Sequence, residues 1–150
     1  MSNLEVGQVL SLKMRYNNSG DISTTKHPYL IVDINKTLGV VEVAQIDSLE
    51  GKEHKAAFRS NKTILNSDPV ETVLDKDSYV QMDNIFRLEN CAELEQYRRQ
   101  TDKLSPLKLD AVQNAYRRYH ETHEIDENKN VYIDRNEILE LNKEYSSEIR

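Results

Sequence analysis

Apolar and polar residues alternate strictly from Leu10 to Tyr16. A period of two is that of a half-buried β-strand, whose successive side chains point to opposite faces of a sheet. We therefore expect the apolar members of this run to face a core: Leu10, Leu12, Met14 and Tyr16. The polar side chains between them, Lys13 and Arg15 included, are expected to face outward.

Further apolar runs predict strands at residues 29–34, 40–46, 63–65, 78–82 and 84–88, and the last two form either one bent strand or two. Loop-forming residues separate the runs. Residues 17–21 are typical of a loop, and residues 35–39, with glycine at the end, suit a hairpin turn. Short strands with turns at this spacing favour a small barrel or sandwich.

The last third of the chain changes to a helical period. Asn90 suits the N-cap of a helix that runs to about Lys103, and Ser105-Pro106 suits the start of a second helix. Apolar residues at helical spacing then form a stripe: Leu107, Val112, Ala115, Tyr116 and Tyr119.

A third helix is predicted to begin at Asp134, because Glu137 follows it at the spacing of a capping box. Its apolar positions are Ile138, Leu141 and Tyr145. The whole pattern predicts a mainly β protein with appended helices, in the α+β class.

The composition suits one core, or one core with an appendage: 150 residues, 37% apolar and 31% charged. No apolar run approaches the roughly 18–20 residues that span a membrane, and the N-terminus lacks the basic-then-apolar order of a signal peptide. Cys91 is the only cysteine, so no internal disulfide forms, which suits a reducing cytoplasm. We expect Cys91 to be a packing residue rather than a reactive thiol.

The formal net charge of −6 argues against indiscriminate binding of nucleic acid but leaves room for a local basic surface. Basic residues gather between residues 51 and 67, where Glu53 is the only acid: Lys52, His54, Lys55, Arg59 and Lys62. This segment is either a solvated loop or a loop that contacts phosphate.

Five segments follow one another in the order of a known family. Residues 6–10 match an opening strand that contains glycine, residues 27–32 an Arg-Pro dipeptide with an apolar strand, and residues 41–48 a strand that ends in Thr or Ser. Residues 74–81 match a stretch in which a serine opens the next strand, and residues 103–105 the entry to a late helix. Together, over about residues 5–120, they resemble the MazF/PemK family of toxin endoribonucleases.

This resemblance implies an SH3-like β-barrel with its associated helix over residues 1–104, and it leaves residues 105–150 as a C-terminal helical extension. It also implies a cytoplasmic homodimer, the growth-inhibiting toxin of a toxin-antitoxin system, restrained by a cognate antitoxin. The implied activity needs no cofactor. Single-stranded RNA is cut when a ribose 2′-OH attacks its own phosphate, which leaves a 2′,3′-cyclic phosphate and a 5′-OH.

In the family, the arginine before proline and the Thr or Ser after the third strand carry much of this work. Here those positions hold His27 and Ser48. Histidine transfers protons near neutral pH, so we expect His27 to act as general acid or base, with Lys26 supplying fixed positive charge. Ser48 is expected to contact the phosphate or the 2′-OH. The structural alternatives are a polar residue before proline for His27 and a turn residue for Ser48.

RNA contacts are expected from basic and polar side chains on the strands and the basic loop: Lys13, Arg15, Lys52, Lys55, Arg59, Lys62, Ser78 and Gln81. The alternative for Lys13 and Arg15 is a solvated strand face, and for Ser78 and Gln81 a role in capping or lining a strand. Tyr16 or Tyr79 would be able to stack on a base.

Residues 126–137 match the ligand spacing of an EF-hand calcium loop, with candidate positions Asp126, Asn128, Asn130, Tyr132, Asp134 and Glu137. Val131 stands where that loop requires glycine. The alternative is a polar turn in which Asp134 and Glu137 cap a helix. Two other functions therefore stay open beside the ribonuclease: a non-catalytic barrel that binds RNA or protein, and a calcium-binding helical module.

Overall fold

The computed structural model describes residues 1–143, and Tyr145 lies outside them. Seven strands are formed: β1 (Val9–Leu12), β2 (His27–Asn35), β3 (Val40–Ser48), β4 (Asn61–Ile64), β5 (Ser78–Gln81), β6 (Ile85–Glu89) and β7 (Asn130–Ile133). The α-helices are α1 (Pro106–Thr122) and α2 (Arg135–Leu141). Short 3-10 helices lie at η1 (Glu53–Ala57), η2 (Ala92–Tyr97) and η3 (Glu127–Lys129).

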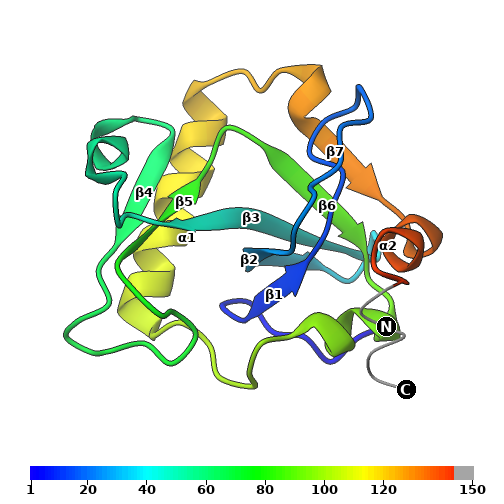
Figure 1. The fold of residues 1–150 in the computed structure, drawn as a ribbon, viewed down its shortest axis with the longest axis horizontal. Helices are drawn as coiled ribbons and strands as arrows, with labels where there is room; N and C mark the ends of the chain where they lie inside the picture. Colours follow the sequence, from blue (N-terminus) through cyan, green and yellow to red (C-terminus); the bar gives the residue numbers. More distant parts are fainter. Residues whose placement is uncertain (144–150) are drawn as a thin grey trace.

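The strands form one mainly antiparallel sheet with the order β1-β2-β3-β5-β4 (Figure 1). The long strand β3 has two partners on the same side: its first half pairs with β6, and its last three residues pair with β5. β7 joins the other side of β6 as a parallel strand. The expected α+β class, mainly β with a few helices, is therefore confirmed.

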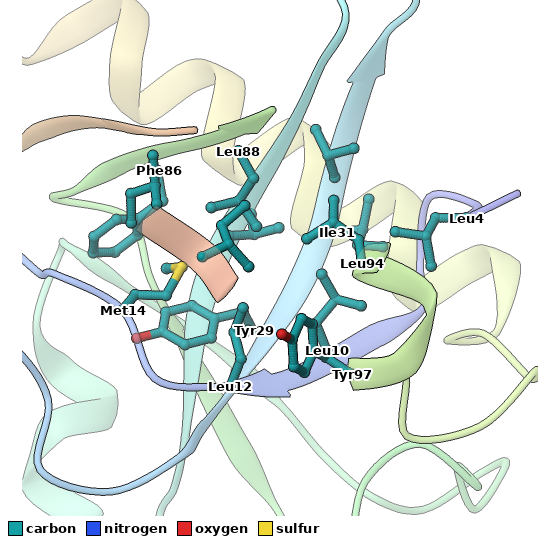
Figure 2. Packing of buried hydrophobic residues seen from close by; sticks show 14 of the residues in the cluster. Leu4, Leu10, Leu12, Met14, Tyr29, Ile31, Phe86, Leu88, Leu94 and Tyr97 are labelled. Atoms are coloured by element: carbon teal, nitrogen blue, oxygen red, sulfur yellow. The ribbon is translucent and has the colours of Figure 1, made fainter. Parts of the chain in front are cut away.

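The central strand β2 is buried on both faces. Tyr29 and Ile31 point into a first core, which η2 and α2 cover with Leu94, Tyr97 and Ile138 (Figure 2). Leu30 and Val32 point into a second core, which α1 covers from the opposite face of the sheet. Burial on two sides explains why residues 29–32 are a continuous apolar run rather than an alternating one.

Helix α1 begins where the sequence predicts, with Ser105 as N-cap and Pro106 as its first residue. A buried carboxylate from a distant loop fixes this end: Glu71 Oε1 accepts the Ser105 backbone N–H at 2.7 Å, and Glu71 Oε2 pairs with Lys108 Nζ at 3.1 Å. Val112 and Tyr116 of the predicted stripe are buried, and Ala115 and Tyr119 pack beside them. Leu107 is an error of the prediction, because its side chain in the first turn is 86% exposed.

The first predicted strand is shorter than its pattern. β1 ends at Leu12, and although Met14 is still buried, Tyr16 is 44% exposed. β1 ends at Leu12 because Leu12 pairs with His27, the first residue of its partner strand β2. Beyond β1, the Arg15 guanidinium pairs with Glu137 at 2.8 Å and donates to the carbonyl oxygen of Tyr132.

The helix expected from Asn90 to Lys103 is also wrong, since only η2 forms. Leu94 and Tyr97, three residues apart, are buried in the first core. After them the chain extends along β1, where the Arg99 N–H donates to the carbonyl oxygen of Val9. The segment after Tyr97 therefore pairs with β1, some 90 residues away in sequence, and does not follow its local preference for a helix.

The C-terminal extension is not purely helical, because it contributes β7 to the sheet and Val131, Ile133 and Ile138 to the first core. Helix α2 does begin as predicted, with the Asp134 side chain accepting from the Glu137 N–H. Over residues 1–143, no helix has the length and apolar character that crossing a membrane demands.

Candidate active site

The structure places His27 and Ser48 in different clefts on opposite faces of the sheet. His27 lies at the start of β2 and shares its face with Tyr29 and the first core. Ser48 ends β3 and shares its face with Ile46 and the second core. The two predicted catalytic side chains are therefore not brought together, because strand alternation sends them to opposite sides.

The Ser48 cleft has a volume of about 220 Å³ and is lined by residues that include Pro28, Ile46, Ser48, Lys76, Ser78 and Arg99. In it, the Ser48 hydroxyl accepts the Glu50 backbone N–H at 3.1 Å, and the Ser78 hydroxyl donates to the carbonyl oxygen of Lys76. Both contacts are made within a turn. In this structure Ser48 therefore has the contacts of a turn residue.

The His27 cleft has a volume of about 500 Å³, and its wall includes His27, Gln45, Gln81, Asn84, Tyr16 and Lys129. His27 is half-buried and Tyr16 is exposed at the rim. Among residues 1–143, none that lines this cleft is Asp or Glu. On a chain with 26 acidic residues, an acid-free cleft that offers amide donors and an imidazole suits a ligand that carries negative charge.

A charged network on β3 and β5 includes Asp47, which lines the Ser48 cleft. Asp47 accepts from Lys52 Nζ at 2.8 Å and from the Tyr79 hydroxyl at 3.2 Å. Burial would raise the pKa of Asp47, but the Lys52 ammonium and the donors from Ser48 and Tyr79 hold it below its ordinary value. Burial and the Asp47 charge raise the pKa of the Tyr79 hydroxyl, which the Gln81 side chain partly offsets.

The predicted RNA-contacting residues are divided among several environments. Gln81 lines the His27 cleft, whereas Lys26 is exposed and does not line it. Arg15 is held by Glu137, Lys52 by Asp47, and Lys55 lies 5.7 Å from the ring centre of Phe58. Lys13 is half-buried beside Asn142, which accepts its backbone N–H.

Arg59 and Lys62 line a third hollow, the basic cleft, between β4 and α1. Its wall also includes Asn61, Asn114, Arg118 and His123. Sequence reasoning missed the helical half of this wall. Asn114 and Arg118 are four residues apart in a helix whose start was predicted, so they lie on one face. No sequence signal indicated that this face lies beside β4.

The structure does not bring the candidate calcium ligands together around one point, and residues 130–133 of the loop form a strand. Residues 130–133 are β7, extended and paired with β6, where a calcium loop must coil around the ion. The end ligands are engaged elsewhere: Asp134 caps α2 and Glu137 binds Arg15. Over residues 1–143 no group of three or more His, Cys, Asp or Glu side chains is arranged to hold a metal ion.

Cys91 is buried in the first core, and burial raises the pKa of its thiol. The prediction that it is a packing residue is confirmed. No protein-family model matches the chain, and no curated protein matches it either.

Proposed function

We propose that this protein is a metal-independent endoribonuclease that cuts single-stranded RNA in the His27 cleft. The observation that carries the proposal is the half-buried imidazole of His27 in a cleft whose lining has amide donors and no carboxylate. The order of the segments that resemble the MazF/PemK family adds support, as does the mainly antiparallel sheet, which is compatible with an SH3-like barrel.

The reaction needs a group that moves one proton and donors for the charged phosphorane. Neutral His27 takes the proton of the ribose 2′-OH while the 2′ oxygen forms its bond to phosphorus. The bond from phosphorus to the 5′ oxygen then breaks, and the His27 imidazolium returns the proton to that oxygen. The products are a 2′,3′-cyclic phosphate and a 5′-OH, and no water, metal or cofactor is consumed.

Four side chains of the same cleft have supporting roles in this proposal. The amides of Gln45 and Gln81 donate to the phosphorane oxygens, where fixed donors stabilise developing charge. The exposed ring of Tyr16 stacks on a base next to the cut. Lys129, whose ammonium is paired with Asp83 at 3.1 Å, supplies positive charge in place of Lys26.

The biological role follows from the family resemblance alone. We propose a toxin that inhibits growth by cutting RNA in the cytoplasm, works as a homodimer and is restrained by a cognate antitoxin. Ser48 is left out of the catalytic set, because its cleft opens on the other face of the sheet.

The test is to incubate the full chain with a long single-stranded RNA in EDTA. Fragments with 2′,3′-cyclic phosphate and 5′-OH ends are expected, and His27→Ala should abolish them. RNA that stays intact at every pH from about 5 to 8, the range in which histidine changes charge, would overturn the proposal in favour of a non-catalytic barrel.

A further inference from the structure

The basic cleft lies between β4 and α1 and has a volume of about 540 Å³. Three cationic side chains line it, Arg59 and Lys62 from the β4 side and Arg118 from the helix. His123 follows the end of α1 and lines the same wall, together with the amides of Asn61 and Asn114. None of the residues from 1–143 that line this cleft is acidic.

The positive charge of the cleft is not neutralised by the protein. Within residues 1–143 the side chains of Arg59, Lys62 and Arg118 make no ion pair, although the protein has a net charge of −6 and many other cations are paired. Grouped cations without internal partners repel one another and concentrate anions from solution. The observation therefore indicates an external ligand with more than one negative charge.

An aromatic surface lies in the same wall. The rings of Tyr119 and His123 are stacked, with centroids 4.1 Å apart and planes 10° apart, and both residues line the cleft. Flat rings beside grouped cations form the combination that binds single-stranded nucleic acid, where cations hold phosphates and rings stack on bases.

The basic cleft and the His27 cleft are neighbours at the end of β5. Asn61 of the basic cleft is paired across the β4/β5 ladder with Gln81 of the His27 cleft. Met82, the next residue, lines the basic cleft. A strand of RNA that passes over this end of the sheet would meet both clefts.

We propose that the basic cleft binds the sugar-phosphate backbone of single-stranded RNA and anchors the strand that the His27 cleft cuts. The second part of this inference rests on the proposed ribonuclease function, and the first part does not. The lining residues of α1 extend from Ala111 to Thr122, a rise of roughly 17 Å at 1.5 Å per residue, which is long enough for more than one nucleotide. An acidic protein segment would match the charges but would leave the stacked rings unused.

The experiment measures binding of the full chain to a fluorescent 2′-O-methyl oligouridine by anisotropy at several salt concentrations. This probe has no free 2′-OH and cannot be cut. A length of about 12 nucleotides falls within the roughly 4–16 nucleotides of known single-strand sites. Three phosphate contacts predict a slope of log K against log salt of about −2, since each contact contributes about −0.7 for single strands.

The double variant Arg59→Ala/Arg118→Ala should raise the Kd at least tenfold and reduce the slope to about −0.7. Both residues are exposed, so the fold should be kept, and far-UV circular dichroism checks this. Lys36→Ala, compared with Arg118→Ala alone, is the control for the loss of one positive charge, because Lys36 lies in the exposed turn between β2 and β3. Arg118→Lys should retain most of the salt dependence.

Two results would overturn the inference: a double variant that binds as tightly as the parent chain, or poly-glutamate that competes as well as unlabelled RNA. The second result would assign the cleft to an acidic protein partner. His27→Ala separates this inference from the proposed function, because it should stop cleavage of natural RNA and leave the Kd for the uncut probe unchanged. Tight binding through the basic cleft by a parent chain that never cuts would support the binding site and contradict the ribonuclease.

Discussion

The His27 cleft and the basic cleft are of similar size, about 500 and 540 Å³, and neither is lined by an acidic residue. They differ in the chemistry of the side chains that line them. The His27 cleft has an imidazole, neutral amides and one cation, Lys129, which is paired with Asp83, whereas the basic cleft has three cations without ion pairs among residues 1–143 and a stacked pair of rings. In the proposed function, one face of the sheet moves the proton and the other holds the RNA strand.

Under the proposed function, this difference predicts that cleavage of RNA and binding of RNA can be changed separately. Any variant that changes cleavage and binding together would show that the two clefts do not act separately.

The largest effect is expected from His27→Ala, which should lower kcat by about 10²–10⁴-fold, the usual contribution of a general acid or base. KM should change little, because the basic cleft still holds the RNA. Steady-state cleavage of a short fluorogenic RNA measures both constants. A KM that rises in parallel with the loss of kcat would show that His27 binds the substrate rather than transferring a proton.

Glu71→Ala should destabilise the fold by about 3 kcal/mol, since breaking a buried ion pair leaves Lys108 and the Ser105 N–H without their partner. Chemical denaturation measures the free energy of unfolding. Because Glu71 fixes α1, RNA binding should weaken more than kcat falls. Glu71→Gln, which keeps an acceptor for Ser105, should lose less stability, and an equal loss in both variants would contradict this role of the hydrogen bond.

Asp47→Asn should cost less than about 1 kcal/mol at neutral pH, because Lys52 and Asp47 are partly exposed to solvent. The pKa of Asp47 in the folded state lies below the ordinary value of 3.8. The ionised carboxylate therefore adds stability above about pH 4, and this contribution is lost as the pH falls through the folded pKa. Unfolding measured at pH 7 and near pH 3 should show the difference between variant and parent shrinking in acid.

Ser48→Ala should change kcat/KM by less than about twofold, since the Ser48 hydroxyl is engaged in a turn on the face opposite His27. The same cleavage assay measures it, with His27→Ala as the reference for complete loss. A drop in kcat/KM of tenfold or more would indicate that the reaction takes place in the Ser48 cleft and not in the His27 cleft.

Short-range patterns in the sequence predicted most elements of the fold. The apolar strand from Tyr29, the Ser105-Pro106 helix start and the Asp134 cap lie where they were expected, and the alternating strand from Leu10 forms in its first half. Each depends on neighbours within a few residues, because strand periodicity and helix capping are local properties. The class of the fold followed from the order of these elements.

The tertiary structure decided everything that depends on partners far apart in the chain. The first strand stops at Leu12 because its partner β2 begins at His27, and residues 130–133 are a strand because β6 is available to pair with them. The same holds for the candidate sites. Sequence supplied His27, Ser48, Arg59 and Lys62, but strand register separated His27 from Ser48 and the packing of α1 brought Arg118 to Arg59. Local chemistry determines which side chains are present, and long-range packing determines which of them meet.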